Sequence, residues 1–289
     1  MRTLSGLALL LGILTVYSCK TSMTASPPVP TNYEEDIAAW RSQRIANLIA
    51  PTGWLSLTGL YWLKEGANYC GSADDARIRL SADAPEIVAV YTLDNGAVDC
   101  EILAESGVEA QSPDECAMAI GSQRWQLLER GGRFGVRVRD TLLPARISLL
   151  PIEHFPTEVA YRVYAEWRPA KGLDSVLMRN VLDMEYYIPV EGLLRFQLQG
   201  KTHELMALDG GPDDLFLIFS DLTTGDTTYG GGRYLYCARP DAEGRTIIDF
   251  NKAYNPPCAF TDYATCLLPR AENELPIALL AGEKTYGNH

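Results

Sequence analysis

The chain has 289 residues, of which 47% are hydrophobic and 21% charged, as is usual for a globular protein. Its formal net charge of −12 and the absence of any basic run argue against a nucleic-acid partner and against a general attraction to anionic lipid. The length suffices to bury a sizeable core, in one large domain or two small ones.

The N-terminus has the pattern of a secretory signal. Arg2 precedes an apolar stretch from Leu7 to Val16, which is shorter than the roughly 20 residues needed to span a bilayer. It ends in Val-Tyr-Ser-Cys, which resembles a bacterial lipoprotein box. This predicts that residues 1–18 are a signal peptide and that acylated Cys19 anchors the protein to a bacterial membrane, outside the cytoplasm. A plain secretory signal and an uncleaved anchor are the alternatives.

Residues 19–32 are rich in Ser, Thr and Pro and are predicted to be a flexible, lipid-anchored tether. Residues 33–289 are predicted to form a single β-rich domain that begins with a helix over 33–49. Thr31 and Asn32 are candidates for its N-cap, with Glu34 and Glu35 placed as in a capping box.

Two arginines, Arg41 and Arg44, fall on the apolar face of this helix, beside Trp40. A guanidinium on an apolar stripe either extends past the apolar surface to water or meets an acceptor. Both interpretations stay open: partial exposure, or contact with an anion or carboxylate.

Short runs with strand-like patterns follow the helix. Tight Gly-containing turns separate several of them, at 131–132, 200–201 and 241–244, and predict hairpins. No long helical segment recurs between the runs, so a βαβ fold is not expected. We predict an antiparallel sandwich or barrel with one N-terminal helix packed on it. The predicted strands are 76–80, 87–93, 98–103, 124–129, 134–138, 145–149, 161–167, 193–199, 203–208, 215–219, 233–238 and 246–250.

There are seven cysteines, and if Cys19 carries the lipid, six remain. An even number outside the cytoplasm suggests disulfides, although the sequence does not choose among the pairings, and buried free thiols are the alternative. Cys258 and Cys266 share one loop and are candidates for a bridge. No CxxC occurs, and neither a metal nor a cofactor is predicted. One set of aspartates lacks calcium-loop spacing and is interpreted as solvated turns: Asp209, Asp213, Asp214, Asp221 and Asp226.

The stretch from Asp249 to Cys266 concentrates polar and rigid residues. It follows a predicted strand and contains Pro256-Pro257, which fixes the backbone. We expect a polar pocket here, with Gly230, Gly231, Gly232 and Arg233 on an adjacent wall and with Asp249 or Glu283 as a partner for Arg233. The alternative is that these side chains satisfy loop backbone groups. The predicted ligand contacts from the stretch itself are Asp249, Asn251, Tyr254 and Asn255.

Several motifs together resemble a known family. They are GWLSLTGLYWLKEG (53–66), GVRVRD with Pro144 and Arg146, YGGGRYLY (229–236), and the stretch from Asp249 through LPIALLAGEK (275–284). The resemblance is to the bacterial and archaeal domain of unknown function 1684, over about residues 33–286. It implies no reaction, cofactor or catalytic residue.

Three functions are compatible with the sequence. The leading hypothesis is a lipid-anchored cell-envelope protein that binds a small molecule in a polar pocket of its C-terminal quarter. The second is a hydrolase that uses Asp249 or Glu283 of that pocket as acid or base. The third is a structural or interaction module of the cell envelope. In each case the predicted membrane contact is the N-terminal anchor alone.

Overall fold

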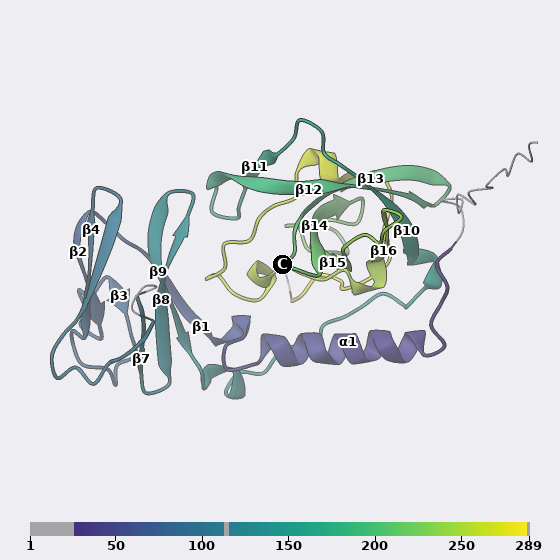
Figure 1. Ribbon diagram of the computed structural model, residues 1–289. Helices are drawn as coiled ribbons and strands as arrows, with labels where there is room; N and C mark the ends of the chain where they lie inside the picture. The colour runs from purple at the N-terminus through teal and green to yellow at the C-terminus, as the bar shows by residue number, and fades with distance from the viewer. Residues whose placement is uncertain (1–25, 113–115, 288–289) are drawn as a thin grey trace, which may run out of the picture.

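The computed structural model describes residues 26–112 and 116–287 (Figure 1). The fold is mainly antiparallel β, with three sheets and, in the described part of the chain, one α-helix, which confirms the predicted class. Two small sheets lie at one end of the molecule and a larger sheet at the other (Figure 1). None of the helices in the described ranges has the length and apolar character to span a bilayer. The predicted signal peptide and Cys19 lie outside the described residues.

Helix α1 (Tyr33–Leu48) lies along one side of the large sheet (Figure 1). It buries Tyr33, Ile37 and Leu48. The predicted capping box does not form, because Asn32 has φ −106° and ψ 33° and its side chain makes no capping hydrogen bond. The acidic residues of the first turn still stabilise the helix, because they lie at the positive end of its dipole.

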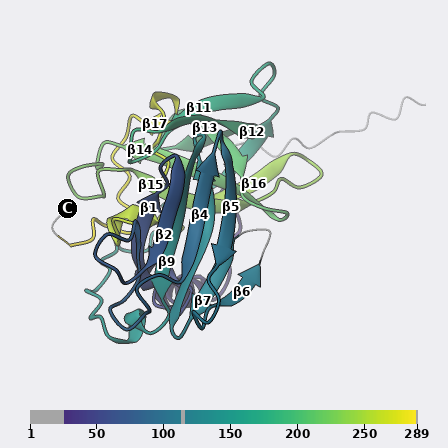
Figure 2. The ribbon, with the colours of Figure 1, turned by 90° about the vertical axis from the view of Figure 1, so that its left-hand side faces the viewer.

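The two small sheets pack on a shared core that includes Tyr91 from one sheet and Trp125, Val136 and Val138 from the other. Figure 2 views the molecule from this end. The first sheet has the order β1 (Leu57–Trp62), β9 (Arg133–Asp140), β8 (Gln123–Arg130), β7 (Ala117–Ile120), β6 (Glu109–Ser112). The second has the order β3 (Ile78–Arg79), β2 (Gly66–Gly71), β4 (Ala89–Asp94), β5 (Ala97–Ile102).

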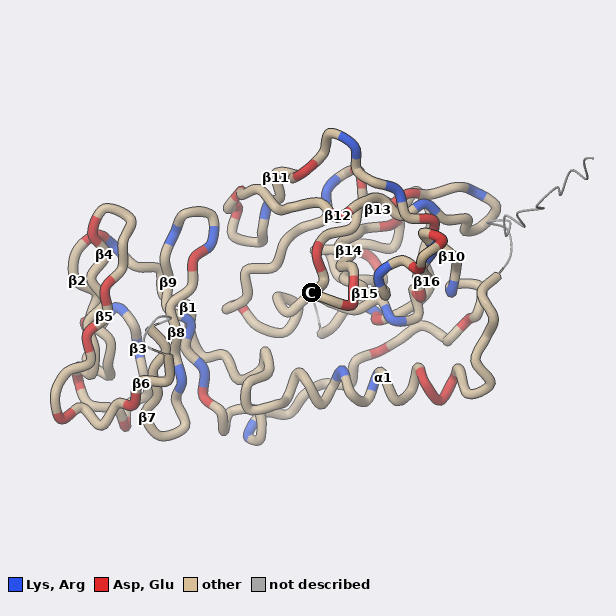
Figure 3. Tube along the Cα trace, viewed as in Figure 1, with Lys and Arg blue, Asp and Glu red and all other residues tan. Residues whose placement is uncertain are grey.

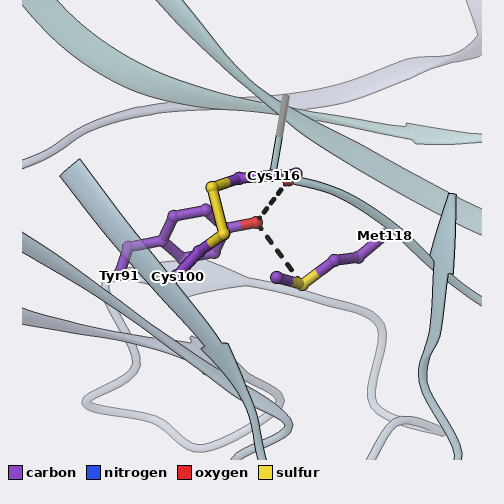
Figure 4. Close-up of a disulfide and its surroundings, with 4 residues drawn as sticks. All are labelled: Tyr91, Cys100, Cys116 and Met118. Carbon is purple, nitrogen blue, oxygen red and sulfur yellow. Dashed lines mark hydrogen bonds between the residues drawn. A yellow bond between two sulfur atoms is a disulfide. The ribbon is translucent and has the colours of Figure 1, made fainter. Parts of the chain in front are cut away.

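A disulfide between Cys100 and Cys116 joins these two sheets (Figure 4). The Tyr91 hydroxyl lies beside it and donates to the carbonyl oxygen of Cys116 at 3.0 Å and to the sulfur of Met118 at 3.6 Å. The bridge therefore closes a loop within the N-terminal half and lies at the core that the two small sheets share.

The large sheet curls into a nearly closed barrel around Phe196, Phe219, Phe250 and neighbouring aliphatic residues. Its order is β15 (Arg233–Ala238), β14 (Asp214–Asp221), β13 (Lys201–Asp209), β12 (Glu185–Leu198), β10 (Arg162–Arg168), β16 (Arg245–Asp249). Two further strands attach at its sides: β11 (Ser175–Arg179) pairs with β12, and β17 (Glu274–Leu275) pairs with β14.

The hairpins predicted at 131–132 and 200–201 are confirmed, since Arg130 pairs with Arg133 and Leu198 with Lys201. The hairpin predicted at 241–244 is wrong, because β16 pairs with β10 rather than with β15. Pro240 has no N–H to continue a ladder there. The side chain of Asp241 instead accepts the backbone N–H groups of Glu243 and Arg245, so the turn closes on itself.

The strand predicted at 145–149 is also wrong. A short 3₁₀ helix, Leu143–Ala145, contains Pro144 in its first turn, and no strand follows it before β10 in the described chain. The end of the predicted tether lies near the large sheet, where Arg162 donates to the carbonyl oxygen of Pro28 at 2.9 Å.

Candidate functional site

An aromatic cleft opens where α1, the β8–β9 hairpin and the large sheet meet. Two cavities of about 420 and about 340 Å³ share the lining residues Trp54, Tyr234 and Pro257 and together form this cleft. The first is also lined by Glu129, Arg130, Gly131, Arg137, Tyr186, Ile188, Thr265, Cys266 and Leu267. The second is also lined by Trp40, Gln43, Arg44, Asn47, Phe216, Tyr236 and Tyr254.

The large-sheet wall of the cleft is a set of stacked rings. Tyr236 is stacked between Phe216, 4.8 Å away, and Tyr254, 6.4 Å away, as measured between ring centroids. Tyr234 meets Phe216 edge-on at 4.9 Å, and Trp40 of α1 approaches Tyr254 at 6.4 Å. Ring faces and edges of this kind are suited to holding a flat apolar group.

Arg137 of β9 is the unusual charge in the cleft. It alternates with the buried Val136 and Val138, so its side chain lies on the opposite face of the sheet from the small core. Its guanidinium lies 5.4 Å from the Trp54 ring centroid. Its Nε and Nη2 atoms are buried and have no hydrogen-bond partner in the described chain.

Burial lowers the pKa of Arg137 to about 10, and the positive charges of Arg130 and Arg139 act in the same direction. The group is still charged at neutral pH. Buried polar groups are normally hydrogen-bonded, and an unpaired buried charge is costly. Figure 3 shows basic residues, drawn blue, along the β8–β9 hairpin on this strongly acidic protein.

The predicted site residues Asp249 and Asn251 lie together, but in a closed internal network. The Tyr33 hydroxyl donates to both carboxylate oxygens of Asp249, at 2.8 and 2.9 Å. The amide of Asn251 donates to the Tyr33 oxygen at 2.9 Å and to the carbonyl oxygen of Glu158 at 2.8 Å. Burial, together with the Asp249 carboxylate, raises the pKa of Tyr33. This network fastens the start of α1 to the end of β16.

The predicted residues Glu283 and Asn255 fasten the middle of α1 in the same way. The fully buried carboxylate of Glu283 accepts from Arg44 Nε at 3.2 Å and from the backbone N–H of Asn255 at 2.8 Å. Burial raises the pKa of Glu283. The amide of Asn255 donates to the carbonyl oxygen of Lys284 at 2.7 Å. Arg44 thus meets a carboxylate, the second of the two alternatives for the helix arginines.

Arg233 pairs with Asp221 at 2.6 Å, so the predicted partners Asp249 and Glu283 are wrong. The interpretation of Asp221 as part of a solvated turn is wrong too, because Asp221 is buried and also accepts hydrogen bonds from Thr223. The sequence alone does not show how β14 and β15 pair, so it could not predict that Asp221 and Arg233 meet.

The triglycine before β15 is a turn. Gly230 and Gly231 precede Gly232, whose φ is +79° and whose added Cβ would lie 2.7 Å from the carbonyl oxygen of Phe219. Packing against β14 therefore explains this glycine. Among the predicted ligand-binding residues, all of which the structure describes, Tyr254 is the one that lines either cavity.

Cys258 and Cys266 are adjacent but unbonded. The backbone N–H of Cys258 donates to the sulfur of Cys266 at 3.1 Å, and the Tyr229 hydroxyl donates to the sulfur of Cys258 at 3.6 Å. A hydrogen bond from Cys266 lowers the pKa of Cys258, and the same bond with burial raises the pKa of Cys266. A disulfide between them stays a prediction.

Sequence reasoning missed Trp54 and Arg137, which line the first cavity together with Glu129, Arg130 and Gly131 of the β8–β9 hairpin. The signal in the sequence is the alternation of GVRVRD, which puts Arg137 and Arg139 on one face and two valines on the other. The described residues contain no cluster of three or more side chains that could hold a metal ion.

The fold and the cleft define a mainly antiparallel β protein with an aromatic, arginine-bearing cavity between its two groups of strands. The chain belongs to the family described as protein of unknown function (DUF1684), which matches residues 149–284. The matched segment supplies Tyr234, Tyr254 and Cys266 to the cleft, whereas Trp54 and Arg137 precede it.

The chain is also similar to a protein of Haloarcula marismortui whose solution NMR structure is titled as that of an uncharacterized protein. The two are 33% identical, the match covers 48% of this chain and 78% of that chain, and the TM-score is 0.39. No curated protein matches the chain.

Proposed function

We propose that the protein binds a small molecule in the aromatic cleft, and that this ligand carries a flat apolar ring and an anionic group. The observation that carries the proposal is the Arg137 guanidinium, which has two buried nitrogens without a hydrogen-bond partner in the described chain and borders a cavity of about 420 Å³. A carboxylate or phosphate oxygen placed there would accept from these nitrogens.

The charges around the cleft support an anion over a cation. Arg44 already has Glu283 as its partner, whereas Arg137 has neighbouring arginines instead. Glu129 lies at the first cavity but is exposed, so its charge is screened by water. An anion at Arg137 would relieve the repulsion among the arginines as well as supply the missing acceptor.

The rings support the apolar part of the ligand. Tyr234, Tyr236 and Tyr254 line the same cavity as Trp54, so a planar group could contact rings from both halves of the protein. Binding would then bridge the small sheets and the large sheet. We further propose that this happens outside the cytoplasm, on a protein held by lipidated Cys19, as the N-terminal sequence predicts.

The geometry favours binding over the hydrolase hypothesis. The candidate acids and bases Asp249 and Glu283 are both buried and hydrogen-bonded to α1. Neither lines one of the two cavities of the cleft. A purely structural module would not require an unpaired arginine inside a cleft.

Three probes with one ring test the proposal: benzoate, phenyl phosphate and the neutral benzyl alcohol. Binding is followed by tryptophan fluorescence, because Trp54 lines the cleft. Wild-type protein should bind the two anions at least about tenfold more tightly than the alcohol, since a hydrogen bond to a charged group is worth about 1.5–3 kcal/mol. Arg137→Gln should abolish this preference.

Arg133→Gln is the matched control. Arg133 is also on β9 and also lies over a tryptophan, 4.7 Å from the ring of Trp62, but it lines neither cavity. This variant should keep the preference for anions. Equal affinity of wild type for all three probes, or an unchanged preference in Arg137→Gln, would refute the proposal.

A further inference from the structure

The loop that contains Cys258 and Cys266 forms part of the cleft wall and brings two unbonded sulfurs together. Pro256 and Pro257 are buried directly before Cys258 and restrict the backbone there. Cys266 lines the first cavity. The 3.1 Å hydrogen bond from the Cys258 backbone to the Cys266 sulfur fixes the two ends of the loop against each other.

The two cysteines differ in the way that attacking and resolving thiols differ. Cys258 is partly exposed and its sulfur accepts from the Tyr229 hydroxyl at 3.6 Å. Cys266 is more buried, at 7% exposure. The hydrogen bonds that Cys258 receives from the Cys266 thiol and the Tyr229 hydroxyl favour its thiolate and lower its pKa. Donation from the Cys266 thiol to Cys258, together with burial, favours the thiol of Cys266 and raises its pKa.

Other titratable groups surround the pair. The hydroxyl of Tyr234 and the guanidinium of Arg137 are close enough to Cys266 to interact with its charge, and Asp262 interacts in this way with Tyr229. His154 and His203 are held elsewhere, at an isolated bridge to Glu283 and in the β12–β13 hairpin respectively. Among the described residues the arrangement is therefore a dithiol rather than a Cys–His pair.

We propose that Cys258 and Cys266 form a thiol–disulfide exchange site, in which Cys258 attacks a small external disulfide and Cys266 resolves the product. The Cys258 thiolate attacks one sulfur of the external disulfide. A mixed disulfide forms on Cys258, and the first external thiolate leaves and takes up a proton. Cys266 then loses its proton and attacks the Cys258 sulfur, which forms the Cys258–Cys266 bond and expels the second external thiolate, and this thiolate also takes up a proton.

The net reaction converts two protein thiols and one external disulfide into one protein disulfide and two external thiols, so electrons and protons balance. The site does not depend on a ligand in the aromatic cleft, and the two proposals can fail separately. The cleft is tested with the Cys258–Cys266 pair kept reduced, and the exchange site without any aromatic probe.

The experiment uses reduced full-length protein and glutathione disulfide, with acid quenching and mass spectrometry of the peptides. Wild type should link Cys258 to Cys266, with two glutathione molecules released for each such bridge that forms. Cys266→Ser should stop halfway, with glutathione retained on Cys258. In Cys258→Ser, Cys266 should take up glutathione at least about tenfold more slowly than Cys258 does in Cys266→Ser.

Cys237→Ser is the matched control, because Cys237 is a free, buried cysteine of β15 away from the pair, and this variant should react as wild type does. Tyr229→Phe keeps the ring but removes the hydroxyl that donates to Cys258. Its reaction should be slower, with the midpoint of the pH–rate profile moved upward.

Three results would overturn the proposal. The first is that the Cys266→Ser variant is folded, as judged by circular dichroism, but retains no glutathione on Cys258. Another is an equal rate for the two cysteines in the two single variants. The third is a wild-type bridge that excess reduced glutathione fails to open, since that bond would be a static link rather than an exchange site.

Discussion

Asp221→Asn should destabilise the large sheet by about 3–5 kcal/mol, the usual cost of removing one partner of a buried ion pair. The side chains of Arg233 and Asp221 are 1% and 0% exposed, and their N···O distance is 2.6 Å. The carboxylate also accepts the backbone N–H of Leu279, and Arg233 donates to the carbonyl oxygens of Leu279 and Ala281. Asparagine keeps the shape but removes the charge, which leaves the buried guanidinium without its ion-pair partner.

Urea denaturation, followed by circular dichroism and fluorescence, measures this loss as a lower midpoint at an unchanged slope. Asp209→Asn is the control. It breaks an ion pair of similar length, 2.7 Å to Arg239, whose partners are exposed to 62% and 35%, and it should leave the midpoint nearly unchanged. If Asp221→Asn shifts the midpoint no more than Asp209→Asn does, the argument from burial is refuted.

Two further changes test other parts of the structure. Burial, with Arg41 nearby, lowers the pKa of His154 from 6.5 to about 4, so the folded protein binds fewer protons than the unfolded chain between these values. The resulting stability is complete above pH 6.5 and is lost as the pH falls towards 4, by up to about 3 kcal/mol. The urea midpoint of His154→Gln should therefore change less with pH in this window than that of wild type. An equal change of the midpoint with pH in the two proteins would contradict the argument. Glu283, whose pKa is raised, makes stability change with pH in the opposite direction, and it does so in both proteins. Replacing Cys100 and Cys116 by serine should cost about 3 kcal/mol, given their separation of 16 residues, and an unchanged urea midpoint would show that the bridge does not constrain the unfolded chain.

The fold class could be predicted because its signals are local. Alternation of apolar residues and the Gly turn at 200–201 predict the C-terminal half of β12 and most of β13. The extent of α1 also follows from its pattern, although its capping box does not. The short β2, which begins and ends with glycine, has little such signal. β11 pairs with the first residues of β12, 185–189, which were not predicted to be a strand. Which strands meet depends on long-range packing, and for that reason the partner of β16 was predicted wrongly.

The site could be predicted only in part. The polar residues of 249–255 do converge, but on Tyr33 and Arg44 of α1, more than 200 positions away in the sequence. No local pattern shows that they satisfy one another. The arginines of α1 were the better clue, because charges on an apolar face need partners. The small core and the barrel core are separate clusters, so a single unfolding transition would test the predicted single domain over 33–289.

The most direct test of the proposed function is an NMR titration of the arginine Nε–H signals with phenyl phosphate. The proposal predicts that the Arg137 signal shifts and saturates at the Kd found by fluorescence, while the Arg133 signal stays in place. If other signals of the protein titrate with the probe and the Arg137 signal does not move, the anion binds elsewhere and the proposed role of the cleft is contradicted.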